Sequence, residues 1–159
     1  MNSPTYALAE SLGTKLRTRG WLLATAESCT GGGLAHALTE VPGSSDWFDR
    51  GFVTYSNESK TQMLGVSADL VTQFGAVSGE VAAAMAQQAC HLAGTQVSVA
   101  TTGIAGPGGG SADKPVGTVW FGWSVAGRVA TECCHFAGDR AAVRSAAVLW
   151  ALQKLDSLL

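Results

Sequence analysis

Residues 21–33 read WLLATAESCTGGG, and this stretch decides the fold class that the sequence predicts. Residues 21–26 form a short, mainly apolar run, and residues 27–33 form a polar break that ends in three glycines. A short apolar run bounded by turn-forming residues is typical of a buried strand. We expect a helix to follow as far as Glu40, so the stretch predicts a strand, a turn and a helix in succession.

The rest of the chain repeats these two patterns. Capping residues and glycine stops indicate the helices, and β-rich runs indicate the strands. We expect further helices over 4–19, from 56 onward, 67–74, 78–93 and 139–158, and further strands over 51–55, 96–102, 118–125 and 129–136, the last two forming a hairpin. Strands that alternate with helices, together with one hairpin, predict a three-layer α/β/α sandwich with a mixed, mostly parallel sheet.

Composition limits the classes of protein to which the chain can belong. Its 159 residues suit one core, so we expect a single domain over residues 1–159. A formal net charge of −2 without a basic cluster argues against a nucleic-acid partner. No apolar run reaches the ~18 residues of a membrane span, and the first residues lack a signal-peptide pattern. We therefore expect a cytoplasmic protein with no membrane attachment.

The cysteines and histidines do not form a metal-binding pattern. Cys29, Cys90, Cys133 and Cys134 lack C-x-x-C spacing, and the three histidines are scattered among them. The standard nucleotide fingerprints of glycine-rich loops are also absent. We expect reduced thiols, no metal and no organic cofactor.

Ser28 is the first candidate for a catalytic residue. It follows the first expected strand, and open α/β sheets bind ligands at the carboxyl ends of their strands. Gly31 and Gly32 permit close approach of the backbone, and free N–H groups at the start of the helix would stabilise negative charge on an attacked carbonyl. The alternative is that Ser28 or Thr30 only caps the helix.

A serine nucleophile needs a base, and lysine is the candidate because no histidine lies in a polar, glycine-rich turn. Lys60 follows the strand that ends at Tyr55, and a parallel pairing would bring both residues to the same sheet edge as Ser28. Partial burial would lower the pKa of Lys60 and let the neutral amine accept a proton. Tyr55 would pass a proton to the leaving amine. The alternative is a surface lysine and a tyrosine at the sheet edge.

Cys29 competes with Ser28 for the role of nucleophile. A thiol at a helix N-terminus can have a lowered pKa. The sequence places no histidine to pair with Cys29, so a small apolar core residue is the simpler interpretation.

The segment 103–117 and the start of the last helix are candidates for substrate binding. The segment reads GIAGPGGGSADKPVG, and a loop of this length is usually functional or disordered. Thr102 and Gly103 lead into it, and its glycine amides can surround a phosphate or ribose. Arg140 lies in the first turn of the last helix, where the dipole disfavours a cation unless an anion is bound. Arg144, one turn on, can lie on the same face and add a second positive charge. The alternatives are a mobile surface loop and a solvated arginine paired with Asp139.

Several motifs together resemble the CinA C-terminal domain family. They occur in the family's order over essentially the whole chain: TAESCTGG at 25–32, PGSS at 42–45, GFVTYSNESK at 51–60, GAVS at 75–78, TGIAGPGGGSADKPVGTVW at 102–120 and GDR at 138–140. The resemblance implies an α/β/α fold with a mixed sheet and a homo-oligomer. It also implies a nicotinamide-nucleotide amidase, which converts nicotinamide mononucleotide to the acid and ammonia and returns the product to NAD synthesis.

The resemblance also assigns roles to residues. Carried over by motif, Ser28 is the nucleophile, Lys60 the base and Tyr55 the helper. Six further residues are expected to bind the nucleotide substrate: Thr30, Gly31, Gly32, Thr102, Gly103 and Arg140. The alternative is a nucleotide-binding regulatory module that keeps the pocket without turnover, and release of ammonia distinguishes the two.

Overall fold

A computed structural model describes residues 3–159 as one five-stranded sheet with helices on both faces. The sheet order is β2-β1-β3-β4-β5. The strands are β1 (Leu23–Glu27), β2 (Phe48–Val53), β3 (Val97–Gly103), β4 (Thr118–Val125) and β5 (Arg128–His135).

The sheet is mixed, as the sequence predicts. β1 pairs in parallel with both β2 and β3, whereas β4 is antiparallel to β3 and to β5. Because β5 reverses direction again, it runs the same way as β1, β2 and β3, and only β4 is opposed. The prediction of a mixed, mostly parallel sheet is therefore confirmed.

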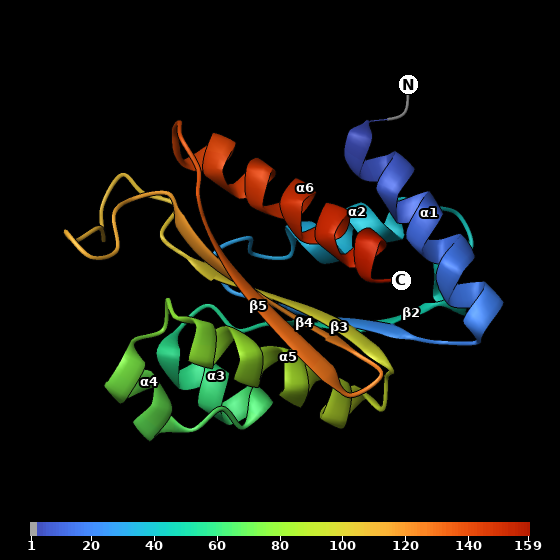
Figure 1. Ribbon diagram of the computed structural model, residues 1–159, viewed down its shortest axis with the longest axis horizontal. Helices are drawn as coiled ribbons and strands as arrows, with labels where there is room; N and C mark the ends of the chain where they lie inside the picture. The colour runs from blue at the N-terminus through green and yellow to red at the C-terminus, as the bar shows by residue number, and fades with distance from the viewer. Residues whose placement is uncertain (1–2) are drawn as a thin grey trace.

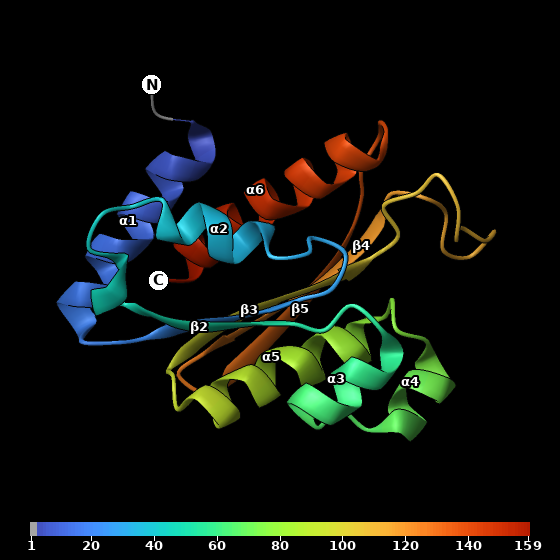
Figure 2. The same ribbon diagram turned by 180° about the vertical axis from the view of Figure 1, so that it is seen from behind.

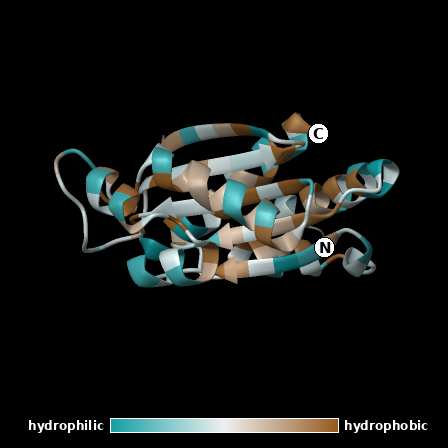
Figure 3. Cartoon of the chain, turned by 90° about the horizontal axis from the view of Figure 1, so that it is seen from below, coloured by the Kyte–Doolittle hydropathy of each residue, from teal (hydrophilic) through white to brown (hydrophobic). Residues whose placement is uncertain are grey.

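The helices form two outer layers (Figures 1 and 2). One face of the sheet is covered by α1, α2 and α6, and the other by α3, α4 and α5. In the view of Figure 3 the helices alternate hydrophobic and hydrophilic residues, as expected of helices that bury one side. Their bounds are α1 (Pro4–Arg19), α2 (Gly33–Thr39), α3 (Asn57–Leu64), α4 (Ala68–Phe74), α5 (Gly79–Ala93) and α6 (Arg140–Leu158), with a short 3₁₀ helix at Ser44–Asp46.

Most helices begin where a side chain satisfies a free backbone N–H. Ser56 caps α3, Ser67 caps α4, Ser78 caps α5 and Asp139 caps α6. Each of these side chains accepts a hydrogen bond from the backbone three residues ahead, which is the ordinary N-cap geometry. The sequence-based boundaries of these helices agree with the structure to within about two residues.

The second strand differs from its expected position. The sequence indicates a strand over 51–55, but β2 covers Phe48–Val53. β1 sets this range, because its residues Leu23 to Glu27 pair with Phe48 to Val53. The ladder continues one bond further, from the Thr54 N–H to the Glu27 carbonyl. Tertiary pairing therefore decided the start of this strand.

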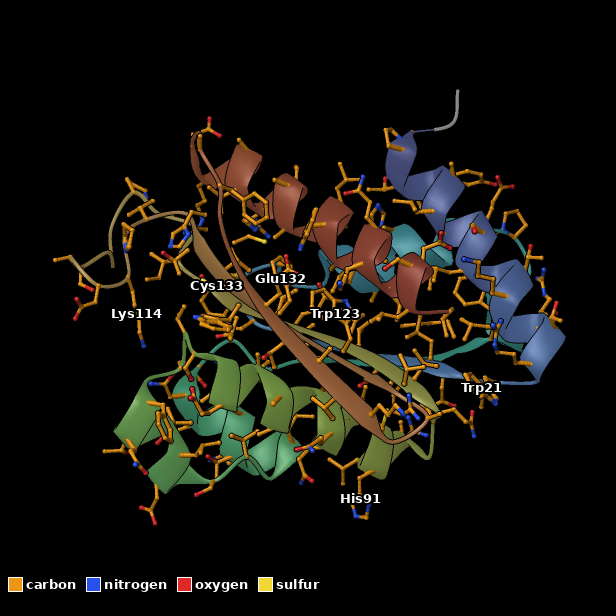
Figure 4. The ribbon with its side chains drawn as sticks, in the orientation of Figure 1. Trp21, His91, Lys114, Trp123, Glu132 and Cys133 are labelled. Carbon is orange, nitrogen blue, oxygen red and sulfur yellow. The ribbon has the colours of Figure 1, made fainter. Side chains whose placement is uncertain are left out.

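Two apolar clusters hold the layers together, one on each face of the sheet. On the face of α1, α2 and α6 the stacked rings of Phe121 and Trp123 lie in the core, and the Trp123 indole donates to the Ala151 carbonyl at 3.0 Å (Figure 4). β1 is buried along its whole length because helices cover both of its faces. Its last residue, Glu27, is a fully buried carboxylic acid.

Within residues 3–159 no helix combines the length and apolar character that crossing a bilayer requires. The four cysteines are free thiols in this structure.

Candidate active site

The candidate site lies where β1 and β2 end. Ser28 directly follows β1, and residues 54–56 lead from β2 into α3, which carries Lys60 in its first turn. Because β1 and β2 are parallel, both segments leave the sheet at the same edge. The predicted meeting of these two parts of the chain depends on this pairing.

The amine of Lys60 contacts the hydroxyl of Ser28. The Nζ–Oγ distance is 3.1 Å, and the two residues are 1% and 8% exposed, respectively. The amine also donates to the backbone carbonyls of Thr54 at 3.0 Å and Tyr55 at 3.3 Å. The two candidate groups therefore share one buried environment.

The surroundings of Lys60 favour the neutral amine. Burial lowers the pKa of Lys60 below its ordinary value because the charged form loses its hydration. Among residues 3–159 no carboxylate lies within ion-pair distance of this amine. The amine also lies 3.5 Å from the Ser56 carbonyl. A neutral amine has two N–H donors for the nearer carbonyls of Thr54 and Tyr55, which leaves its lone pair for the proton of Ser28.

The pair lies in the wall of a cavity of about 190 Å³. Pockets that enclose drug-sized ligands measure roughly 300–1,000 Å³, so this one can enclose only part of a nucleotide. It is lined by Ser28, Cys29, Tyr55, Asn57, Lys60, Ala76, Val77, Thr102, Gly103, Ala105 and Arg140.

Arg140 and Tyr55 lie at the mouth of this cavity. The guanidinium of Arg140 donates to the Tyr55 hydroxyl and to the Gly106 carbonyl, both at 2.8 Å. Asp139 caps α6 instead of pairing with Arg140. In the described chain no carboxylate neutralises Arg140. The mouth thus carries a positive charge whose two contacts are neutral oxygens.

Tyr55 contacts Ser28 and Lys60 through its backbone. Its carbonyl oxygen accepts from Lys60 and lies 3.4 Å from the Ser28 hydroxyl, whereas its phenol ring is largely exposed. The phenol therefore lies at the cavity mouth beside Arg140, in line with a role toward the substrate.

Thr102 and Gly103 line the cavity, as expected, and the structure gives both a second role. The Thr102 hydroxyl donates to the Ala76 carbonyl at 2.8 Å. A side chain at Gly103 would meet the Thr118 carbonyl at 2.8 Å, so glycine allows β3 and β4 to pack closely. The following loop is tethered by Lys114, which reaches toward α4 and donates to the Phe74 carbonyl at 2.8 Å (Figure 4).

Thr30, Gly31 and Gly32 do not line this cavity. The Thr30 hydroxyl points into the protein and donates to the Glu27 carboxylate at 2.6 Å. Thr30 also borders a separate surface hollow of about 520 Å³ between α1, α2 and α6. The N–H of Gly31 donates to the Ser28 carbonyl at 3.0 Å, so it is occupied.

The expectation of free N–H groups at the start of α2 is wrong for Gly33, Leu34 and Ala35, and the N–H of Gly33 donates to the Thr30 carbonyl. The carboxylate of Glu27 accepts from the N–H of Leu34 at 2.8 Å and from that of Ala35 at 3.1 Å. The alternative that Ser28 or Thr30 caps this helix is also wrong, because the N-cap is Gly32 and makes no side-chain cap bond. A negative side chain of the protein itself occupies the helix start.

Cys29 does not have the properties of a reactive thiol. Burial raises the pKa of the Cys29 thiol to about 12, because the thiolate loses its hydration. Its side chain packs in the apolar cluster under α6. The geometry therefore favours Ser28 as the nucleophile.

Sequence reasoning identified some residues of the site without their contacts. It places Arg144 on the same helix face as Arg140, as a second positive charge. Arg144, one turn after Arg140, donates to the Cys29 carbonyl at 3.1 Å and so contacts the turn that carries Ser28. Ala76 and Val77 line the cavity from the segment between α4 and α5. Ala76 and Val77 fall within the GAVS motif at 75–78, but nothing local predicts that they line the cavity, because only the tertiary packing brings this segment to the sheet edge. For Glu27 a signal existed, since an acid at the end of a buried strand needs a partner.

Within the part of the chain that the structure describes, no three His, Cys, Asp or Glu residues gather in an arrangement able to hold a metal ion.

The sheet and the site together define an α/β protein with a serine and a lysine at the carboxyl edge of parallel strands. The chain belongs to the CinA C-terminal domain family, whose model matches residues 5–159. It is 53% identical to the nicotinamide-nucleotide amidohydrolase PncC of Enterobacter agglomerans, over 93% of this chain and 91% of that protein. It is 50% identical to the PncC of Escherichia coli K12, over 97% of this chain and 94% of that protein.

Solved structures show the same fold. The competence/damage inducible protein CihA of Agrobacterium tumefaciens matches with a TM-score of 0.95 at 44% identity, over 99% of this chain and 97% of that one. The resemblance to this family and the α/β fold predicted from the sequence are therefore confirmed.

Proposed function

We propose that the chain hydrolyses the carboxamide of nicotinamide mononucleotide to nicotinate mononucleotide and ammonia, in the recycling of pyridine nucleotides. The observation that carries this proposal is the 3.1 Å contact between Lys60 and Ser28 in a cavity whose mouth holds the unneutralised Arg140. The names of the relatives support the choice of substrate, because two proteins that align over nearly the whole chain are called nicotinamide-nucleotide amidohydrolases.

In the first half of the reaction the neutral amine of Lys60 removes the proton of Ser28. The Ser28 oxygen attacks the carboxamide carbon and forms a tetrahedral oxyanion. Collapse of this intermediate breaks the C–N bond, and the nitrogen leaves as ammonia with the proton from the Lys60 ammonium. We assign Tyr55, which lines the cavity, a role in assisting this proton transfer.

In the second half, water attacks the ester that joins the acyl group to Ser28. Lys60 accepts a proton from this water, and the Ser28 oxygen leaves as the hydroxyl when the acid is released. Ordinary amide hydrolysis in this form needs no redox partner, because no electrons are gained or lost.

The backbone N–H of Cys29 is our candidate for holding the oxyanion. It directly follows the nucleophile, and it donates to no other residue among those that the structure describes. The carbonyl of the same peptide unit belongs to Ser28 and accepts from Gly31, which fixes the plane of this unit. A preorganised N–H of this kind stabilises charge that develops in the transition state.

The charge at the mouth supports a phosphate-bearing substrate. The cavity is too small for a whole nucleotide, so the ribose and phosphate would extend past the mouth toward Arg140. A guanidinium binds phosphate through paired, charge-assisted hydrogen bonds. The Gly-rich loop after Gly103 lies against the same arginine through Gly106 and is our candidate for contacts to the ribose.

Release of ammonia from the purified chain tests the proposal. We expect turnover with nicotinamide mononucleotide, weaker turnover with the nicotinamide riboside, and none with nicotinate mononucleotide. Calorimetry with the same compounds measures binding alone. Tight binding of the mononucleotide without ammonia release would reject the amidase and support a regulatory module.

The remaining predictions concern the state of the protein. We propose that residues 1–159 act as one domain, in a homo-oligomer, in the cytoplasm. Light scattering during size-exclusion chromatography measures the oligomeric state. A monomer at micromolar concentration would contradict the proposed homo-oligomer.

A further inference from the structure

Glu27 is a buried carboxylic acid with no role in the proposed reaction. It is 0% exposed and directly precedes the nucleophile. Burial of a charged group is costly unless hydrogen bonds satisfy it. Among the described residues Glu27 has no cationic partner. A position so close to the reacting hydroxyl therefore calls for a physical reason.

The carboxylate of Glu27 closes a ring of hydrogen bonds around the Ser28 turn. Oε1 accepts from the Thr30 hydroxyl at 2.6 Å and from the Leu34 N–H at 2.8 Å, and Oε2 accepts from the Ala35 N–H at 3.1 Å. Both oxygens act as acceptors, which is the role of a carboxylate. The acid thereby ties the end of β1 to the start of α2, across the turn that carries Ser28.

Thr101 completes this ring from the neighbouring strand. Its carbonyl accepts the N–H of Ser28 at 2.9 Å, and its hydroxyl lies 2.8 Å from that of Thr30. Because the only hydroxyl proton of Thr30 is given to Glu27, Thr101 must donate to Thr30. Thr101 of β3 thus contacts both the N–H of Ser28, at the start of the turn, and the hydroxyl of Thr30, in the middle of the turn.

Arg144 holds the turn from the opposite side. Its Nε donates to the Cys29 carbonyl at 3.1 Å, and the residue comes from α6, 115 positions further along the chain. The turn at Ser28 is therefore restrained from β1, β3, α2 and α6. Such restraint matters because the Ser28 oxygen must face Lys60, and a misplacement of about 1 Å can cost ~10²-fold in rate.

We propose that Glu27 and Thr30 are positioning residues, which set the Ser28 oxygen against the Lys60 amine through the Glu27–Thr30–Thr101 network. This inference rests on the proposed function of Ser28 as the nucleophile. It assigns Thr30 a role in orienting the nucleophile and no contact with the substrate. A substitution of Thr30 should lower kcat if Thr30 positions Ser28, whereas it should raise KM if Thr30 contacts the substrate.

The test replaces the Thr30 hydroxyl by a methyl group of similar size. Thr30→Val should lower kcat by about 10- to 100-fold and leave KM for nicotinamide mononucleotide nearly unchanged, because only the placement of Ser28 is lost. Thr30→Ser keeps the hydroxyl and should retain most of the kcat. Glu27→Gln should also lower kcat, because an amide nitrogen cannot accept from a backbone N–H.

Thr95→Val is the matched control. Thr95 is another buried threonine whose hydroxyl donates to a backbone carbonyl, that of Val97 at 3.0 Å. It precedes β3 at the amino end of the strand, opposite to the carboxyl ends that hold the site. We expect this variant to lose a similar amount of stability with an unchanged kcat.

A substrate-free measurement separates this inference from the proposed function. A small sulfonyl fluoride reacts with an activated serine, and peptide mass spectrometry gives the rate of labelling at Ser28. Ser28 of the unaltered chain should be labelled fast, Thr30→Val slowly, and Thr30→Ser and Thr95→Val at the unaltered rate. If the unaltered chain labels at Ser28 but does not release ammonia, only the choice of substrate fails.

Other outcomes overturn the inference itself. A Thr30→Val variant with normal labelling and kcat would show that the hydroxyl does not position Ser28. A raised KM with normal kcat would return Thr30 to the substrate-binding residues. If Thr30→Val does not fold, Thr30→Ser provides the test, because it keeps the hydroxyl. A folded Thr30→Ser variant that loses kcat would also reject the positioning role of this hydroxyl.

Discussion

The amine of Lys60 lies 3.1 Å from the hydroxyl oxygen of Ser28, although the two residues are 32 positions apart in the chain. The contact exists because β1 and β2 are parallel and end at the same edge of the sheet. A buried amine beside a hydroxyl is the arrangement that a Ser–Lys mechanism requires. The predictions below test its parts separately.

The first prediction compares the two adjacent candidates for the nucleophile. Ser28→Ala should lower kcat for ammonia release by at least about 10³-fold, as removal of a nucleophile does in other hydrolases. Cys29→Ala should keep most of the activity, because burial raises the pKa of the Cys29 thiol to about 12 and leaves it protonated. Circular dichroism checks that both variants are folded. The reverse pattern would assign the reaction to the thiol.

The second prediction concerns the base. Lys60→Arg should lose about 10²–10⁴-fold in kcat, because a guanidinium cannot be deprotonated at working pH and a general base contributes about that factor. Lys15→Arg is the matched control, since Lys15 lies on α1 in an ion pair with Asp156 that arginine can also make. Substantial activity in Lys60→Arg would exclude Lys60 as the base.

The third prediction uses the pH dependence of stability. Burial lowers the pKa of Lys60 in the folded protein below 10.5, its ordinary value, which the unfolded chain keeps. Between the folded-state and unfolded-state pKa, the unfolded chain therefore binds more protons than the folded protein. Stability from this group is therefore reduced at neutral pH and recovers as pH rises toward 10.5. Any gain in Tm of Lys60→Met over the unaltered chain should be largest near neutral pH and decrease as pH rises. Thermal melts at several pH values measure this, and a gain that grows with pH would contradict the direction of the shift.

The fourth prediction concerns the phosphate. Arg140→Ala should raise KM for nicotinamide mononucleotide about 10- to 100-fold, which corresponds to a charge-assisted contact of roughly 1.5–3 kcal/mol. KM for the riboside, which has no phosphate, should change little. Arg128→Ala, at the exposed hairpin between β4 and β5, is the control and should affect neither substrate. Equal changes for the nucleotide and the riboside would argue against a phosphate contact at Arg140.

Local signals in the sequence were enough to predict most of the fold. Serine and aspartate caps followed by helical patterns marked α3, α4, α5 and α6, because capping is a contact between residues only a few positions apart. The hairpin between β4 and β5 followed from its turn residues. The start of β2 did not, because pairing with β1 fixes it.

The site was predictable only in part, for the same reason. Ser28 directly follows β1, and Lys60 lies in the first turn of the helix that follows β2. A parallel pairing of β1 and β2 brings them together, and this followed from their order in the chain. The contacts of Arg144 with Cys29 and of Thr101 with Thr30 span 115 and 71 positions, respectively. These contacts depend on how α6 and β3 pack against the turn at Ser28, and no local pattern in the sequence predicts that packing.

The oxyanion donors illustrate how a plausible local rule can fail. Glycines before a helix suggest free N–H groups, but Glu27 occupies those of Leu34 and Ala35. The acid lies within the same motif as Ser28, and only its burial and its hydrogen bonds show that it faces inward toward the helix start.

The central claim is that Ser28 becomes acylated during turnover, and mass spectrometry of the quenched enzyme tests it most directly. Nicotinamide mononucleotide is mixed with the purified chain, the reaction is stopped in acid, and the peptides are mapped. We predict a peptide heavier by the nicotinate mononucleotide acyl group, with the added mass on Ser28. Ammonia release with the added mass on Cys29, or with no acylated peptide at any time point, would contradict the account.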